Sequence, residues 1–599
     1  MQTSSLSRAR QVWFRVIVLL GLLPLSACLA KAPGSGGGGQ QQPLTVTVSP
    51  TPVSLAVGAQ QTFAAVVGPS GTSQGVTWGQ PTLSPNSSAS GAGTALGTMS
   101  TSGVYTAPTS IAACSAGTTQ CNLQVVITAT STADASYSGQ ALVNVHVTVA
   151  MSPLTNSVGG GALTIGQGAN LQFTSTVTGT SNQNVNWGAV CSACTNGQGG
   201  GGFDPNNLGL YLAPPFEQGV TTAQTVTLTA TSAFDSTQVA LATIMVLPTD
   251  PLGTASPTTA AEAQLPSCPG GGVANGTCYQ VNISCDGIDD WSAYLKVNSP
   301  SGSPVGTVIF GTGSGGSTLY DNDPEFFYGT DNDINGGSAI VQNVLSAGYT
   351  TAQVSFGAPF NSSPSTANGW LQGPGGVRRL ACRYATLAQW IYQNIHNSST
   401  TEPFCATGNS GGAGAIGYAV FDYGMQTIFT MVEPTSGPVM TRIDLGCSPQ
   451  GSNIYGGKTA CTNPPPSNLD MSYSVGAQGD GTASIIDTAY QTFGDSNPPT
   501  LCTNGVNGPS QPNSLRFQSD SIDYAPSKTP ALPISPTVVN VVFGGNDGSN
   551  AVGQGETFWK SVGPPASQAC VQDAPHPIPA SADGVTQIEN DIKTLCVLP

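Results

Sequence analysis

The feature that most restricts the fold is a run of small residues around Ser410, in residues 404–417, which contains the motif Gly408-x-Ser410-x-Gly412. A serine at the tip of a sharp turn from a strand into a helix has strained backbone geometry, so the residues two before and two after it must lack side chains that would collide. Small residues after Ser410 let the next helix lie close to a sheet, with its first N–H groups pointing at the serine. The motif predicts a strand, a tight turn and a helix, with Ser410 as a candidate nucleophile.

The first 27 residues have the pattern of an export signal. Three arginines and no acidic residue precede an apolar run at 16–25, which is too short to span a bilayer. The run ends in Leu-Ser-Ala-Cys at 25–28, which resembles the lipobox of bacterial lipoproteins. The resemblance implies that Cys28 is lipidated and anchors the exported protein to the outer membrane or cell surface. The alternative is an ordinary signal peptide cut nearby.

Composition supports an exported, β-rich protein. Residues 28–43 are rich in Gly and Gln and predict a flexible tether. Without the three signal arginines the chain has 11 bases against 30 acids, a net charge of −19, which argues against nucleic acid as a partner. Beyond Cys28 there are 14 cysteines, an even number that suits disulfides in an oxidising compartment. We expect local bridges Cys114–Cys121, Cys570–Cys596 and Cys191–Cys194.

Residues 44–248 contain an internal repeat, which predicts two tandem domains at 44–150 and 151–248. Three segments of the first copy recur in the second: 76–79 at 185–188, 103–108 at 209–214 and 127–131 at 228–232. Alternating apolar and polar residues argue for β-sandwiches. The pair resembles bacterial immunoglobulin-like domains, and this resemblance implies a role in spacing or adhesion.

Beyond a predicted linker at 249–267, strands alternate with helices in residues 268–599. The apolar patterns predict strands at 305–310, 351–356, 428–432 and 538–543, and helices at 338–347, 377–396 and 584–595. Such alternation predicts a mostly parallel sheet covered on both faces. Residues 447–536 contain three cysteines and many prolines and predict a disulfide-pinned cap. The fold class is therefore two all-β sandwiches followed by an α/β domain.

With the motif at Ser410, the part from about residue 275 resembles an α/β-hydrolase domain, because strand, helix and serine turn come in that family's order. The resemblance implies a Ser, acid, His triad in this chain order. Among three histidines, only His576 follows Ser410, since His146 and His396 precede it. The acid should follow the strand at 538–543, where Asp547 lies.

Three further assignments complete the predicted site. Asp444 is the reserve candidate for the acid. The family's oxyanion hole implies the N–H of Gly411 and one N–H from the loop after 305–310, either Thr312 or Gly313. Residues 331–336 copy the first half of a calcium loop, but the bidentate glutamate is replaced by Gln342, so we interpret them as a turn and helix cap. We expect no metal and no cofactor.

These features together predict an exported serine hydrolase. The expected reaction is hydrolysis of carboxylic esters on extracellular polymers, or of small acyl esters. The alternatives are a serine peptidase and a surface adhesin whose hydrolase-like domain only binds.

Overall fold

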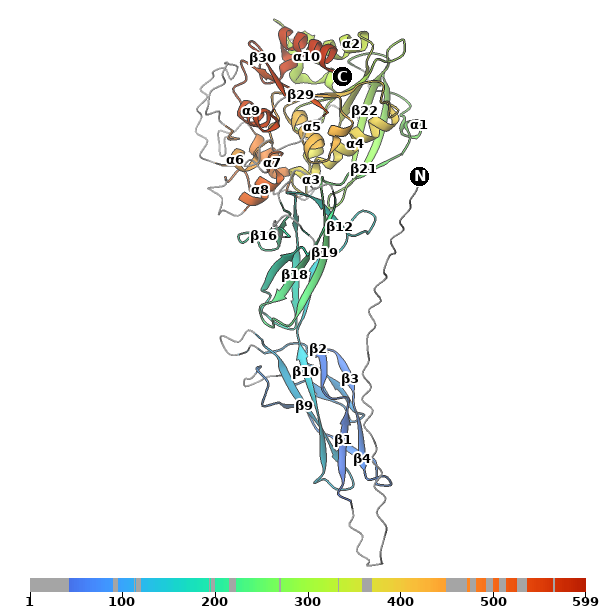
Figure 1. Cartoon of the computed structure of the whole chain (residues 1–599), viewed down its shortest axis with the longest axis vertical. Helices are drawn as coiled ribbons and strands as arrows, with labels where there is room; N and C mark the ends of the chain where they lie inside the picture. The colour runs from blue at the N-terminus through green and yellow to red at the C-terminus, as the bar shows by residue number, and fades with distance from the viewer. Residues whose placement is uncertain are drawn as a thin grey trace, which may run out of the picture.

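The computed structural model describes residues 42–89, 95–112, 114, 120–192, 194, 200–214, 222–268, 271–331, 333–357, 369–448, 471–473, 481–491, 499–505, 513–524, 536–563 and 566–598. The predicted signal, Cys28 and most of the predicted tether lie outside these ranges. Two all-β units lie end to end beneath a larger α/β unit (Figure 1).

In the described residues, the first all-β unit has ten strands that surround one buried cluster. They are β1 Thr45–Ser49, β2 Val53–Ala56, β3 Gln60–Thr62, β4 Ala64–Gly68, β5 Val76–Trp78, β6 Thr82–Leu83, β7 Thr98–Met99, β8 Val104–Thr106, β9 Leu123–Ser131 and β10 Ser138–His146. The strand β10 alternates exposed and buried residues because one face covers the core and the other meets water.

The second all-β unit repeats these pairings. Its strands are β11 Thr148–Ser152, β12 Leu163–Gly166, β13 Asn170–Gln172, β14 Thr174–Thr178, β15 Val185–Val190, β16 Gly202–Phe203, β17 Leu210–Leu212, β18 Gln224–Ser232 and β19 Val239–Leu247. The antiparallel pair β11–β14 corresponds to β1–β4, and the parallel pair β12–β19 corresponds to β2–β10. The sequence repeat thus encodes a repeated strand pairing.

The α/β unit is built on one nine-stranded sheet. In spatial order its strands are β20 Thr254–Ser256, β21 Thr277–Ser284, β22 Trp291–Asn298, β26 Thr350–Ser355, β23 Thr307–Gly311, β27 Phe404–Asn409, β28 Met431–Thr435, β29 Val538–Gly544 and β30 Ser567–Val571. Strands β26 to β30 of this order are parallel, whereas β20, β21 and β22 form an antiparallel edge. The predicted mostly parallel sheet is confirmed.

Helices cover both faces of the sheet. In chain order they are α1 Ala260–Ala263, α2 Gly336–Ser346, α3 Val377–Leu380, α4 Cys382–Asn394, α5 Gly411–Phe421, α6 Ile443–Gly446, α7 Thr482–Thr488, α8 Ser514–Asp520, α9 Ala551–Val562 and α10 Ala582–Leu595. One core cluster joins the sheet to α4, α5 and α9, and the other joins it to α2 and α10. Neighbouring residues of β23 alternate between the clusters, with Ile309 in one and Phe310 in the other.

Several predicted elements differ in detail from those observed. The helix expected at 377–396 is interrupted at Ala381 and becomes α3 and α4. The strand expected at 428–432 begins only at Met431, because its pairing with Cys405 of β27 sets its start. The stretch 249–267 is more than a linker, since β20 within it pairs with β21 at the sheet edge.

The disulfides bear on the cysteine predictions. The bridges Cys114–Cys121 and Cys191–Cys194 are present, as expected. The Cys570–Cys596 pairing is wrong, because Cys596 is bonded to Cys405, with the two Cα atoms 6.0 Å apart. The end of α10 therefore lies against the start of β27, which joins cysteines 191 residues apart in sequence. Three other bridges are Cys268–Cys278, Cys285–Cys382 and Cys447–Cys502.

Six bridges within the described residues suit an oxidising compartment outside the cytosol. In the same part of the chain, every helix is too short or too polar to cross a membrane.

Candidate active site

Ser410 lies in the strained turn between β27 and α5. Its backbone has φ 55° and ψ −110°, outside the regions that most side chains favour. A Cβ at Gly408 would lie 2.9 Å from the backbone of Gly412, and a Cβ at Gly412 would lie 2.7 Å from the carbonyl oxygen of Thr312. The two glycines of the motif are therefore required by the close approach of three backbone segments.

The turn is tied to its neighbours by hydrogen bonds. The Ser410 N–H donates to the carbonyl oxygen of Thr435 in β28, at 2.9 Å. The Asn409 side-chain oxygen accepts from the Thr435 hydroxyl at 3.0 Å and from the Ile578 N–H at 3.3 Å. Because Ile578 follows the His576 loop, the same residue holds the serine turn and the histidine loop together.

Asp547 and His576 form a hydrogen-bonded pair. The Nδ1 atom of His576 lies 2.9 Å from the Asp547 Oδ2 atom. The Asp547 side chain is completely buried, whereas 31% of the His576 side chain is exposed. The turn after β29 is fastened to the histidine loop, since the Asn546 N–H donates to the carbonyl oxygen of Ala574 at 3.0 Å. With Nδ1 facing Asp547, Nε2 is the ring nitrogen that would exchange a proton with a nucleophile.

The Asp547 carboxyl stays ionised despite its burial. Burial raises its pKa, but the hydrogen bond and positive charge of His576 and the hydrogen bonds from Ser549 outweigh this effect and hold the pKa below its ordinary value. One of these bonds is the 2.9 Å contact from the Ser549 N–H to Asp547 Oδ1. A buried carboxylate beside an imidazole fixes its tautomer and stabilises the imidazolium.

A cavity of about 290 Å³ opens over Ser410. His576 and Ser410 both line it, together with Gly411 and Gly313. Its apolar wall consists of Val439, Met440 and Ile485. The last belongs to α7, within the predicted cap, so the described part of this segment contributes to the wall.

The oxyanion-hole candidates differ in position. Gly313 and Gly411 line the cavity. An added Cβ at Gly313 would lie 3.7 Å from the Ser410 Cβ, and one at Gly411 would meet the carbonyl oxygen of Ser314 at 1.7 Å. Thr312 is fully buried, outside the cavity lining, and its hydroxyl donates to the Thr318 carbonyl oxygen at 3.2 Å. We therefore prefer the N–H of Gly313 over that of Thr312 as the second oxyanion donor, because Gly313 lines the cavity beside Ser410 and Thr312 does not.

The other residues considered for the triad lie outside the lining of this cavity. His396 is buried at the end of α4, where its Nδ1 atom lies 3.0 Å from the Thr307 hydroxyl and burial lowers its pKa. His146 is the last residue of β10, in the first all-β unit and not in the α/β unit. Asp444 is held by two hydrogen bonds from Arg442, at 2.9 and 2.7 Å. Asn335 caps α2 by accepting from the Ser338 N–H at 2.8 Å, as the turn interpretation of 331–336 predicts.

Ser549 and Glu325 are among the cavity residues that the sequence did not single out. Ser549 places its hydroxyl 3.1 Å from His576 Nδ1, and its position two residues after Asp547 was the available signal. Glu325 also lines the cavity. No motif marks it, because its position depends on the folding of the loop after β23.

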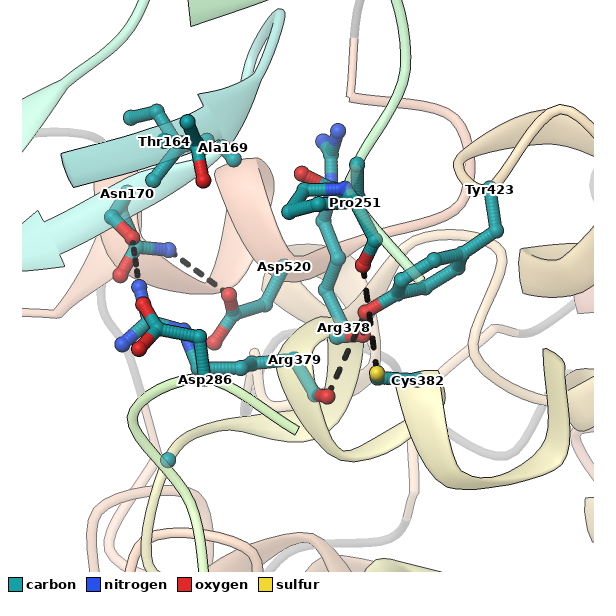
Figure 2. Close-up of a pocket in the computed structure, with 13 residues that line it drawn as sticks. Thr164, Ala169, Asn170, Pro251, Asp286, Arg378, Arg379, Cys382, Tyr423 and Asp520 are labelled. Carbon is teal, nitrogen blue, oxygen red and sulfur yellow. Dashed lines mark hydrogen bonds and ion pairs between the residues drawn. The ribbon is translucent and has the colours of Figure 1, made fainter. Parts of the chain in front are cut away.

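A second cavity lies where the second all-β unit meets the α/β unit. Figure 2 shows side chains from distant parts of the chain around it, including Asn170, Arg378 and Asp520. Its volume is about 40 Å³, room for a few water molecules. The Asn170 amide donates to Asp520 at 2.7 Å, and Arg378 donates to Asp250 at 2.6 Å. This cavity belongs to the junction between the units and is too small for a substrate.

No protein-family model matches this sequence, and no curated protein matches it either. Several solved structures are similar to about half of the chain. A dienelactone hydrolase from Anabaena variabilis ATCC 29413 is 14% identical over 53% of this chain and 96% of its own, with a TM-score of 0.29. A carboxyl esterase from Bacillus coagulans is 14% identical over 53% and 99%, with a TM-score of 0.32. An esterase from Pseudomonas putida ECU1011 is 11% identical over 54% and 85%, with a TM-score of 0.33.

Proposed function

We propose that the protein is a serine hydrolase of carboxylic esters, with Ser410 as nucleophile, His576 as general base and Asp547 as the acid of the triad. One arrangement carries the proposal: a histidine bonded to a buried carboxylate at 2.9 Å lines the same cavity as a serine held in a strained turn. A strained turn at the start of a helix exposes the hydroxyl of its serine and aims N–H groups at the reacting carbonyl.

The proposed reaction has two steps, acylation of Ser410 and its deacylation. Ser410 Oγ attacks the ester carbonyl carbon while His576 Nε2 takes its proton, and Asp547 stabilises the resulting imidazolium. The N–H groups of Gly411 and Gly313 would bind the oxyanion. In the described part of the chain these two N–H groups form no backbone hydrogen bond. His576 then protonates the departing alcohol, which leaves an acyl group on Ser410. In the second step His576 takes a proton from water, and the hydroxide attacks this acyl group and releases the acid from Ser410.

We also propose that the protein acts outside the cell, anchored through a lipid on Cys28 and held away from the membrane by the two all-β units. The end-to-end arrangement of the units supports a spacer role (Figure 1). The substrates would be esters of extracellular polymers, or small esters released from them.

A fluorophosphonate probe tests the nucleophile. We expect the probe to label the folded wild-type protein at one serine, with the modified peptide containing Ser410, and to leave Ser410→Ala unlabelled. Such reagents react only with serines activated by a neighbouring base. Heat-unfolded wild-type protein is the control for nonspecific reaction. If the probe does not label the folded protein, the domain is non-catalytic and the adhesin alternative is favoured.

The decrease in rate on the acid side of the pH profile should correspond to the uptake of one proton. Because its pKa is lowered, Asp547 remains a carboxylate as the pH falls, and proton uptake by His576 is what removes the base. We expect kcat/KM to fall about tenfold per pH unit on the acid side and to be level near pH 8. Stopped assays with a p-nitrophenyl ester would measure the profile. A level rate between about pH 5 and 8 would exclude His576 as the base.

A further inference from the structure

Glu325 is the carboxylate among the described residues that line the Ser410 cavity. It belongs to a short 3-10 turn, η2 Pro324–Phe326. The turn is anchored on both sides of the residue. The side chain of Phe326 is fully buried with its ring centroid 4.8 Å from that of Tyr320, and the Glu325 N–H donates to Asp323 Oδ1 at 2.9 Å. The backbone that presents this carboxylate at the cavity is therefore held in place.

The carboxylate lies close to the reacting atoms. From the Cβ position at Gly313, the Ser410 Cβ is 3.7 Å away and the Glu325 Oε2 atom is 3.8 Å away. Those two distances place Oε2 no more than 7.5 Å from the Ser410 Cβ. A group attached directly to the scissile ester can reach the carboxylate across that span.

Within the described residues, Glu325 has no ion-pair partner, and no lysine or arginine lines the cavity. The negative charge thus acts on whatever enters. It also opposes the oxyanion that forms over Gly313, unless the substrate brings a positive charge to offset it.

We propose that Glu325 selects substrates by charge, so that the site prefers esters with a cationic group beside the scissile bond over neutral esters of the same shape. The proposal rests on the esterase function proposed above. Because Glu325 is exposed to water, screening limits the preference to a factor of about 3 to 10.

Two isosteric esters test it: acetylcholine, and 3,3-dimethylbutyl acetate, in which carbon replaces the quaternary nitrogen. The full chain is assayed as wild type, Glu325→Gln and Glu262→Gln. The last variant removes the same charge from an exposed position on helix α1, outside the cavity lining. The quantity compared is the ratio of kcat/KM for the cationic ester to that for the neutral one. Any loss of activity common to both esters cancels in this ratio.

We expect wild type and Glu262→Gln to share a ratio above one, and Glu325→Gln to lower it by about 3- to 10-fold. The wild-type ratio should also shrink as salt is added, because ions screen exposed charges. An unchanged ratio in Glu325→Gln, with both esters turned over, would overturn the role of Glu325 while leaving the esterase intact. Turnover of neither ester, together with failure of the fluorophosphonate to label Ser410, would overturn the esterase function and this proposal with it.

Discussion

Replacing Asp547 with asparagine should lower kcat by about 10⁴-fold with little change in fold. The amide would donate a hydrogen bond to His576 Nδ1 in place of the one that the carboxylate accepts at 2.9 Å. The proton then resides on Nε2, so the ring cannot take the proton from Ser410. Steady-state rates, normalised to the circular dichroism of the folded protein, would measure the loss.

Asp444→Asn is the matched control, because Asp444 was the other candidate for the acid. Its carboxylate is occupied by the two hydrogen bonds from Arg442 and stands outside the cavity lining. We expect its rate to stay within a few-fold of wild type. The opposite pattern, a large loss with Asp444→Asn and none with Asp547→Asn, would transfer the role to Asp444.

Replacing Arg378 with methionine should destabilise the protein by about 3–5 kcal/mol, the usual cost of breaking a buried ion pair by removing one partner. Only 3% of this side chain is exposed, and it lies 2.6 Å from Asp250 and 3.2 Å from Asp422. It also donates to the carbonyl oxygen of Gln167 in the second all-β unit at 2.7 Å. The methionine would leave two carboxylates without their cation at the junction between the units.

Thermal unfolding would measure this effect, with an expected decrease in Tm of roughly 10 °C. Burial raises the pKa of Asp422, and Arg378 opposes that rise. A carboxyl whose folded pKa is raised favours the fold below its unfolded pKa and loses that contribution as the pH increases. The deficit of Arg378→Met should therefore be smaller near pH 4 than at pH 8.

Lys593→Met removes a charge from a surface pair with Glu589 on α10, where 40% of the lysine side chain and 13% of the glutamate side chain are exposed. Exposed pairs contribute little, so its Tm should stay close to wild type. A decrease of less than about 2 °C in Arg378→Met would contradict the junction role assigned to this residue.

The elements that depend on neighbouring residues were predictable from the sequence. The turn at Ser410 was predictable because only glycine fits at 408 and 412, where an added Cβ would lie 2.7 to 2.9 Å from neighbouring backbone atoms. The strands at 305–310, 351–356 and 538–543 follow from short apolar runs and lie within about two residues of β23, β26 and β29. The choice of His576 followed from the order of three histidines along the chain.

Contacts between distant segments could not be predicted in this way, because they arise only in the folded chain. The Cys405–Cys596 bridge, the preference for Gly313 over Thr312 and the position of Glu325 all depend on which strands and loops become neighbours. The antiparallel edge of β21 and β22 likewise went unpredicted, because strand order is set by packing across the whole sheet. Local sterics act between adjacent residues and leave a readable pattern, whereas these pairings are selected only when the complete core forms.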